Sequence, residues 1–246
     1  MTRNNDINFG MRMSFYLKAA GIALLSIWYS LRVIFTGYFG KNKKLMFTHV
    51  RRWADKVLAA AGISVTVHDA SEGRSGAFIY ASNHSSLFDI PVMLSSIDDN
   101  VRIIYKKELE KIPVFGWGLK VSHHIAIERS DPRNALAAIE KTIEKISSGD
   151  SVIIYPEGTR SKDGKLQEFK RGAFTLAARS GKPVVPVTIV GTNQIMRPGE
   201  RYFRASKVKI HIGSPIEKYP QNRKEEMKLM QEVRERIVAV LEKESG

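Results

Sequence analysis

The sequence predicts an α/β domain that follows a basic and apolar N-terminal segment. Beyond Gly62, short apolar runs alternate with longer segments of helical periodicity, and this alternation is typical of α/β domains. Before Gly62, the chain is strongly apolar and also rich in lysine and arginine. With 246 residues, 43% of them hydrophobic, the chain can form one core of ordinary size. We therefore expect a two-helix segment over residues 1–61 and one α/β domain over residues 62–246.

The first helix is expected within residues 13–39, where only Lys18 and Arg32 are charged. The uncharged stretch between these two residues would form a helix about 20 Å long, shorter than a hydrocarbon core of about 30 Å. Because long basic side chains can extend toward the membrane surface, the sequence leaves open whether this helix spans the bilayer or stays in one leaflet. After a basic turn at residues 41–44, apolar residues at helical spacing predict a second helix that ends near residue 61.

The charge of the chain is concentrated in this segment. The net charge is +14, and residues 1–56 supply +8 of it, from ten lysines and arginines against two aspartates. Basic residues beside an apolar helix favour anionic lipids, by roughly 1 kcal/mol each, and are typical of the cytoplasmic side of a membrane. We therefore predict binding to anionic membrane lipids at the cytoplasmic face of the cell membrane. The alternative is that the two helices cover the core of the domain. No nucleic-acid-reading motif is visible, so no nucleic-acid partner is expected.

Strands and helices alternate beyond Gly62. The strands are short apolar runs, whereas the helices repeat apolar residues every three or four positions. The first of these helices contains Pro91, which a first helical turn tolerates and a helix interior does not. Strands are predicted at residues 63–67, 77–81, 101–105, 124–127, 152–155, 184–190 and 208–212, and helices at residues 90–97, 132–147, 170–180 and 222–244.

A histidine and an aspartate, His84 and Asp89, stand five residues apart after one of these strands. On a regular helix, residues i and i+5 point about 140° apart. The two side chains can therefore meet only if His84 precedes the helix and Asp89 lies in or just before its first turn. A histidine can take a proton from a hydroxyl, and a carboxylate on its other ring nitrogen fixes the tautomer. The spacing thus indicates acid–base chemistry, although Asp89 and Ser86 are also suitable helix caps.

A second group of residues has the properties of a phosphate site. Gly158, after the strand at 152–155, allows the backbone to approach a ligand, and Arg160 offers a planar fork that matches phosphate oxygens. Loops at strand ends are the usual binding sites of α/β sheets. The basic residues at other strand ends that are expected to converge there are Lys106, Lys107 and Arg129. Because successive side chains of a strand alternate, the sequence leaves open which of the two lysines points into the site.

Four motifs resemble, in the expected order, those of the glycerophospholipid acyltransferases, the family of 1-acylglycerol-3-phosphate acyltransferases. Together they cover roughly residues 77–192. The motifs are NHSSLFD at 83–89, KEL at 107–109 leading into IPVFGW at 112–117 and ending at Arg129, YPEGTRS at 155–161 followed by FKRG at 169–172, and VPVTI at 185–189. The resemblance implies a mixed β-sheet flanked by helices.

The resemblance also implies roles for single residues. His84 is expected to be the general base and Asp89 the residue that orients it, in a direct attack without an acyl-enzyme. Residues Glu157, Gly158 and Thr159 form the expected substrate-binding loop, in which Glu157 would pair with an arginine or contact the glycerol hydroxyl.

Ser85 and Ser86 suit turn and capping hydrogen bonds better than a nucleophilic role. The chain has no cysteine, which closes an acyl-cysteine route, and no Gly-x-Ser-x-Gly motif of a serine hydrolase.

The expected reaction is transfer of a fatty acyl group to the sn-2 hydroxyl of 1-acyl-sn-glycerol-3-phosphate (lysophosphatidic acid), which forms phosphatidic acid. The donor is an acyl thioester, and the sequence does not distinguish acyl carrier protein from coenzyme A. No metal or other cofactor is expected. Phe115, Trp117 and the N-terminal helices are expected to shape an apolar path for the acyl chain. The alternatives are an acceptor such as glycerol-3-phosphate, another lysophospholipid or an amine-bearing lipid, and a non-catalytic lipid-binding protein of the same fold.

Overall fold

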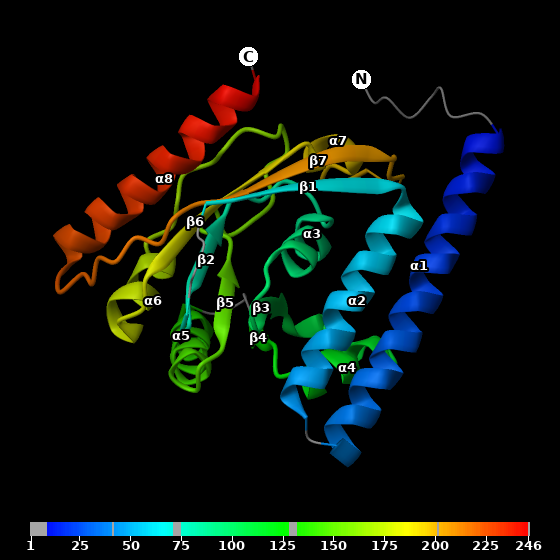
Figure 1. The fold of residues 1–246 in the computed structure, drawn as a ribbon, viewed down its shortest axis with the longest axis horizontal. Helices are drawn as coiled ribbons and strands as arrows, with labels where there is room; N and C mark the ends of the chain where they lie inside the picture. Colours follow the sequence, from blue (N-terminus) through cyan, green and yellow to red (C-terminus); the bar gives the residue numbers. More distant parts are fainter. Residues whose placement is uncertain (1–8, 41, 71–74, 128–131, 201, 246) are drawn as a thin grey trace.

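The computed structural model describes residues 9–40, 42–70, 75–127, 132–200 and 202–245, and its centre is a seven-stranded sheet (Figure 1). The strand order is β1-β7-β6-β2-β5-β3-β4, in which β6 and β7 are antiparallel and the other pairs are parallel. The predicted mixed sheet is therefore confirmed. The strands are β1 (Ile63–Asp69), β2 (Ile79–Ser82), β3 (Val101–Lys106), β4 (Ile125–Ile127), β5 (Ser151–Ile154), β6 (Val184–Val190) and β7 (Ser206–Ile212).

Helices cover both faces of the sheet, which explains why its central strands are continuously apolar. On one face, α2 and α3 enclose a core with the side chains of β2, β6 and β7. On the other face, α5, α6 and α8 pack together over β4, β5 and β6. The helices are α1 (Phe9–Phe35), α2 (Lys43–Ala61), α3 (Asp89–Ser96), α4 (Phe115–Val121), α5 (Pro132–Ser147), α6 (Gly172–Ser180), α7 (Thr192–Ile195) and α8 (Arg223–Ser245).

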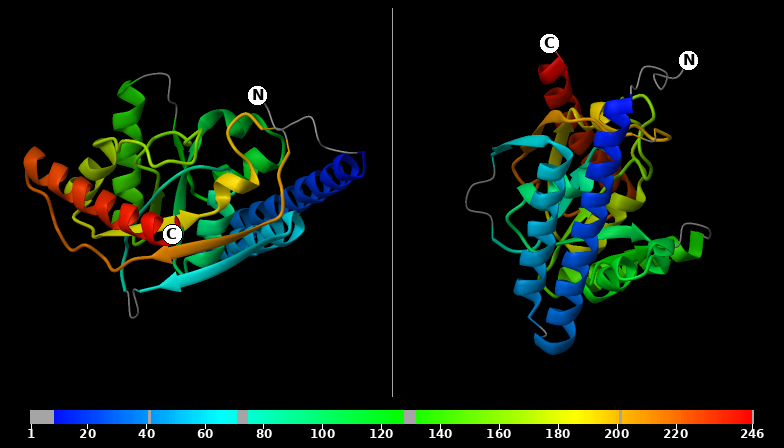
Figure 2. Two further views of the ribbon diagram at one scale, coloured as in Figure 1. Left: turned by 90° about the horizontal axis from the view of Figure 1, so that it is seen from above. Right: turned by 90° about the vertical axis from the view of Figure 1, so that its right-hand side faces the viewer.

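The two predicted N-terminal helices form a hairpin at one end of the molecule (Figure 2). α1 continues into a π-helical turn, Thr36–Gly40, and Asn42 caps α2 through a side-chain hydrogen bond from Leu45 N of 3.0 Å. Gly62 ends α2 in the left-handed conformation, with φ of 77°. Thus α2 leads directly into the edge strand β1.

The two helices of the hairpin differ in burial. α2 places Ala54, Val57, Leu58 and Ala61 in the core, so this helix does cover the domain, as the alternative interpretation of the sequence held. α1 lies outside α2 and leaves large apolar side chains exposed. Only 11% of its most apolar window is buried, and over Arg12–Gly40 it is long and apolar enough to cross a membrane by length and composition.

Short helices between the strands were not predicted. A 3₁₀ turn, Lys107–Lys111, and α4 follow β3, in a region whose glycines and proline read as a loop. The glycines occur in this segment because there is no room for a larger side chain at their positions. An added Cβ at Gly116 would lie 2.5 Å from the Glu110 carbonyl oxygen, and one at Gly118 would lie 2.9 Å from Ser30 of α1. The glycines therefore allow α4 to pack closely on the 3₁₀ turn and on α1.

Candidate active site

His84 and Asp89 meet as the five-residue spacing predicts. His84 lies in the loop after β2, and Asp89 is the first residue of α3. The Nδ1 atom of His84 and the Oδ2 atom of Asp89 are 2.8 Å apart. The backbone N–H groups of Ser85 and Ser86 donate to the same oxygen, at 2.7 and 2.9 Å. Asp89 thus holds both the imidazole and the loop that carries it.

The two residues of this pair differ in their exposure to solvent. Asp89 is fully buried, whereas the His84 side chain is 14% exposed. Because Nδ1 contacts the carboxylate, Nε2 is the ring nitrogen left to accept a proton from a ligand. The pair has the arrangement that a base and its orienting carboxylate require.

Glu157 braces the backbone of the same loop. Its Oε1 accepts the N–H of His84 at 2.6 Å, and its Oε2 accepts the N–H of Gln167 at 2.9 Å. The residue is only 2% exposed, and burial raises the pKa of its carboxyl group. We expected Glu157 to pair with an arginine or to reach the glycerol hydroxyl. Instead, both oxygens are occupied by backbone donors, because the chain folds back over the carboxylate at Gln167.

The turn that follows Glu157 lies directly against His84. Ser161 N donates to the His84 carbonyl oxygen at 2.8 Å. Gly158 has φ of 74°, and an added Cβ there would lie 2.9 Å from the Nζ atom of Lys170. The ammonium group of Lys170 therefore lies over Gly158. Of the remaining predicted loop residues, Thr159 is exposed and Arg160 is half-buried.

The other predicted basic residues are less closely tied to the pair. Lys106 is the last residue of β3 and Lys107 is the first residue after it, and β3 is separated from β2 by β5. All three strands are parallel, so these lysines lie at the same edge of the sheet as His84. Lys106 is exposed and forms an ion pair with Glu108 at 3.1 Å. The predicted residue Arg129 lies outside the described residues.

Serine and histidine side chains near the site have structural contacts. Ser85 Oγ lies 3.1 Å from Thr192 Oγ1, and Ser86 Oγ donates to the Met196 carbonyl oxygen at 2.9 Å. Turn and capping hydrogen bonds were expected of the two serines. Ser86 Oγ also accepts the N–H of Phe88 at 3.4 Å, which is such a bond, whereas the contacts with Thr192 and Met196 join the loop to a distant segment. His124 Nδ1 accepts the N–H of Ile103 at 3.3 Å, and burial lowers the pKa of this histidine to about 3. Within the described ranges, no group of three or more His, Asp or Glu side chains is arranged to hold a metal ion.

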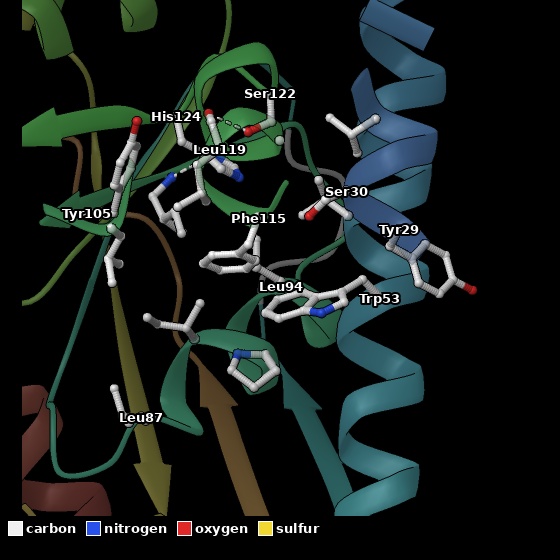
Figure 3. Close-up of a pocket in the computed structure, with 17 residues that line it drawn as sticks. Tyr29, Ser30, Trp53, Leu87, Leu94, Tyr105, Phe115, Leu119, Ser122 and His124 are labelled. Atoms are coloured by element: carbon white, nitrogen blue, oxygen red, sulfur yellow. Dashed lines mark hydrogen bonds between the residues drawn. The ribbon is translucent and has the colours of Figure 1, made fainter. Parts of the chain in front are cut away.

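An apolar cavity of about 140 Å³ begins beside the histidine loop (Figure 3). Leu87, three residues after His84, lies at one side of it, and Trp53 of α2 and Tyr29 of α1 line the side toward the hairpin. Phe115 of α4 also lines the cavity, as expected. Trp117, which we expected to help shape it, is 55% exposed and points elsewhere, because α4 presents its Gly118 and Leu119 to the cavity.

Sequence reasoning missed two residues of this site, Tyr155 and Lys170. The ring of Tyr155 stacks on the imidazole of His84, with ring centroids 4.0 Å apart and an angle of 17° between the planes. Tyr155 was assigned to the end of a strand, and Lys170 resembled an ordinary surface lysine. Both belong to the family motifs that carried the resemblance, which was the signal that could have found them.

Comparisons with known proteins agree with this geometry. Residues 64–190 match the family model described as Acyltransferase. A chloroplastic 1-acyl-sn-glycerol-3-phosphate acyltransferase of Brassica napus is 42% identical over 139 residues, which are 56% of this chain and 40% of that protein. The protein of the same activity from Borreliella burgdorferi is 28% identical over 200 residues, covering 81% of this chain and 80% of that protein.

A solved structure resembles the whole fold. The crystal structure of the 1-acyl-sn-glycerophosphate acyltransferase from Thermotoga maritima has a TM-score of 0.80 and 29% identity, and the match covers 95% of this chain and 94% of that chain. By contrast, the match to the Brassica napus relative spans about two fifths of that protein's length.

Proposed function

Because the chain belongs to the Acyltransferase family, we propose that it transfers a fatty acyl group from an acyl thioester to the sn-2 hydroxyl of 1-acyl-sn-glycerol-3-phosphate. The product would be phosphatidic acid. The observation that carries the proposal is the contact between His84 and the buried Asp89, in a loop whose Leu87 lines an apolar cavity. The activities named for the similar proteins of Brassica napus and Thermotoga maritima support the choice of acceptor.

In the proposed mechanism, Nε2 of His84 takes the proton of the acceptor hydroxyl as its oxygen attacks the thioester carbonyl carbon. The new C–O bond forms, the C–S bond breaks, and the proton passes from His84 to the departing sulfur. Asp89 stabilises the imidazolium that forms between these two transfers. General base catalysis of this kind contributes typically about 10²- to 10⁴-fold. The hydroxyls of both serines beside His84 have hydrogen-bond partners, which supports a direct attack over an acyl-serine.

The acceptor phosphate is proposed to bind at the turn formed by Glu157, Gly158 and Thr159. Arg160 would supply a bidentate fork, and Lys170, whose ammonium lies over Gly158, would supply a second charge. Lys106, Lys107 and Arg129 remain proposed contributors from neighbouring strand ends. Glu157 would act indirectly, because it holds His84 and the turn together.

The apolar cavity is proposed to take part of an acyl chain. Its volume of about 140 Å³ is close to that of engineered apolar cavities that bind one benzene ring, so it holds about six carbon atoms. A longer chain must therefore continue between α1, α2 and α4. Coenzyme A and acyl carrier protein both remain possible donors, since each is acidic and the chain is basic.

The hairpin is proposed to lie in one leaflet at the cytoplasmic face of the cell membrane and to bind anionic lipids. The charges that interrupt α1 both lie against α2 or its C-terminal end. Lys18 Nζ would be 3.5 Å from a Cβ added at Gly62, at the C-terminal end of α2, where a helix dipole favours a cation. Arg32 Nε lies 3.5 Å from His49 Nδ1 of α2.

Pairing with α2 limits how deeply α1 can insert. α2 carries Arg51, Arg52 and Lys56, so a membrane-spanning position of the hairpin would bring these charges into hydrocarbon. A position in one leaflet instead buries the exposed apolar side of α1 and leaves the basic residues of α2 near lipid headgroups.

The test is acyl transfer in detergent, with labelled acyl-coenzyme A and labelled acyl carrier protein offered separately, for wild type and His84→Ala. Lysophosphatidic acid and glycerol-3-phosphate are compared as acceptors. We expect turnover with lysophosphatidic acid and a loss of about 10²-fold or more in the folded variant. Comparable rates on glycerol-3-phosphate would overturn the acceptor. A lipid-binding protein without catalysis would show no turnover with either donor and lipid binding unchanged by the substitution.

A further inference from the structure

Tyr155 follows β5 and covers one face of the His84 imidazole. The two ring centroids are 4.0 Å apart and the planes are within 17° of parallel. The two residues come from neighbouring parallel strands, because β2 pairs with β5. The stack therefore has a rigid basis on both sides: the loop of His84 is held by Asp89, and the turn after Tyr155 is held by Glu157.

The contact between His84 and Asp89 does not by itself fix the imidazole. A single hydrogen bond at Nδ1 leaves the ring able to tilt about that bond, and a tilt moves Nε2 away from the line toward the acceptor hydroxyl. A flat ring stacked on one face of the imidazole prevents this tilt in one direction. Small displacements of a catalytic group are costly, since a misplacement of about 1 Å can lower a rate about 10²-fold.

The hydroxyl of Tyr155 has a different character from its ring. It is buried, and neither it nor Asp89 Oδ1 has a hydrogen-bond partner within the described part of the chain. Burial, with a smaller effect of the Asp89 charge, raises the pKa of Tyr155 well above its ordinary value. The hydroxyl is therefore held in its neutral form. The ring is the part of the side chain that contacts the base.

We propose that Tyr155 is a positioning residue whose ring holds the His84 imidazole in the tilt that aims Nε2 at the acceptor hydroxyl. This inference rests on the proposed function, since it assigns Tyr155 to the same reaction. It predicts that an aromatic ring at position 155 is needed for turnover, whereas the hydroxyl is dispensable.

The experiment compares Tyr155→Phe with Tyr155→Leu in the full chain, with Tyr155→Met as a second variant without a ring. We expect Tyr155→Leu and Tyr155→Met to lower kcat about tenfold or more, with KM for lysophosphatidic acid within about threefold of wild type. Tyr155→Phe should keep kcat within about threefold. Its melting temperature should equal or exceed that of wild type, because the variant removes a buried hydroxyl that lacks a partner.

A matched control removes a buried tyrosine that does not stack on His84. Tyr80, on β2, is 1% exposed and packs in the core against Phe78. Tyr80→Leu should lower the melting temperature and leave kcat at 25 °C near that of wild type. If it lowers kcat as much as Tyr155→Leu does, loss of packing explains both effects and the positioning role is overturned.

A spectroscopic measurement separates this proposal from the reaction itself. In histidine-labelled protein, the stacked ring should shift the His84 ring-proton NMR signal, and the shift should persist in Tyr155→Phe and disappear in Tyr155→Leu. A shift without wild-type turnover would mean that the proposed reaction is wrong while the ring contact is real. Turnover with equal kcat in folded wild type and Tyr155→Leu would overturn the positioning role and leave the reaction standing.

Discussion

At the scale of single residues, the oxygen Oδ2 of Asp89 carries the organisation of the site. It accepts from two backbone N–H groups and contacts Nδ1 of His84, so one atom anchors both the loop and one nitrogen of the imidazole. An uncharged amide in its place could not support the imidazolium, and its NH₂ group could not accept these donors.

Asp89→Asn should therefore lower kcat by about 10²- to 10⁴-fold while the protein stays folded. Acyl-transfer kinetics together with circular dichroism measure both quantities. Asp98→Asn is the control, because the Asp98 side chain is 90% exposed and pairs only with Arg51 among the described residues. A folded Asp89→Asn protein with near wild-type kcat would contradict the orienting role.

Gly158 offers a second test at this scale. With φ of 74° and Lys170 Nζ at 2.9 Å from an added Cβ, Gly158→Ala should strain the backbone and displace the ammonium group. We expect a stability loss of about 1–2 kcal/mol and a KM for the phosphate-bearing acceptor raised about tenfold or more. The measurements are acceptor titration and urea unfolding.

Gly149→Ala is a matched control for the stability loss that comes from backbone strain alone. Gly149 also has a left-handed φ, of 90°, but no atom lies within 4 Å of an added Cβ. This variant should lose similar stability without a change in KM. If both variants change KM equally, the effect belongs to backbone strain and not to Lys170.

Residue-level prediction succeeded where the partners are close in sequence. The contact of His84 with Asp89 follows from a five-residue spacing and a proline. The contact of His84 with Glu157 spans 73 residues, so only the arrangement of β2 beside β5 creates it. The same holds for the Tyr155 stack, and for this reason neither contact was predicted, although both residues lie in recognisable motifs.

At the scale of elements, the exposed side of α1 makes a distinct prediction. Leu17 and Leu24 are each 67% exposed and lie seven residues apart, on one side of the helix. The double variant Leu17→Glu/Leu24→Glu should weaken co-sedimentation with anionic vesicles about tenfold or more, because it places charge at the apolar boundary. Folding should be preserved, since neither side chain belongs to the core.

The control for this experiment is Met227→Glu, on α8, where the side chain is 43% exposed. It should leave vesicle binding unchanged. Unchanged binding of the α1 double variant would show that the membrane contact is elsewhere. Substitution is cleaner than deletion of residues 1–61, because a deletion also removes the core residues of α2.

The elements that were predicted are those with a helical repeat of apolar residues or an uninterrupted short apolar run. Residues 132–147 agree with the observed helix, and both hairpin helices were expected. The 3₁₀ turn and α4 were not, because glycine and proline usually mark loops. Here Gly116 and Gly118 are required because Glu110 and Ser30 approach them closely. These contacts depend on the folded structure and cannot be predicted from the pattern of neighbouring residues.

At the scale of the whole molecule, histidine burial sets a pH dependence of stability. Partial burial lowers the pKa of His124 and His211, so the folded protein disfavours their protonation more than the unfolded chain does. For such groups, stability is fully present above the unfolded value near 6.5 and is lost as the pH falls below it.

For His124, with a folded pKa of about 3, the loss between pH 6.5 and pH 5 is at most about 2 kcal/mol. Urea unfolding at pH 7 and pH 5 should therefore show a smaller pH effect in His124→Gln than in wild type. Equal pH effects in the two proteins would contradict a neutral buried His124.

The order of strands was beyond sequence reasoning. Alternation predicted an α/β domain, and the mixed character of the sheet was implied by the family resemblance. The pairing of β1 with β7 joins residues 63 and 206. Neither strand has a sequence feature that identifies the other as its partner. Similar aliphatic runs can pair in many orders, so long-range packing decides among them.

That pairing also has a consequence for synthesis on the ribosome. The hairpin and β1 emerge before β7, the strand that pairs with β1, which is made 143 residues later (206 minus 63). At about 5–20 residues per second, the delay is about 7–30 s. During this interval the apolar side of α1 is already available to a membrane, while β1 still lacks its partner. Membrane capture of the nascent chain would therefore precede closure of the sheet, and the domain would complete its fold at the membrane surface.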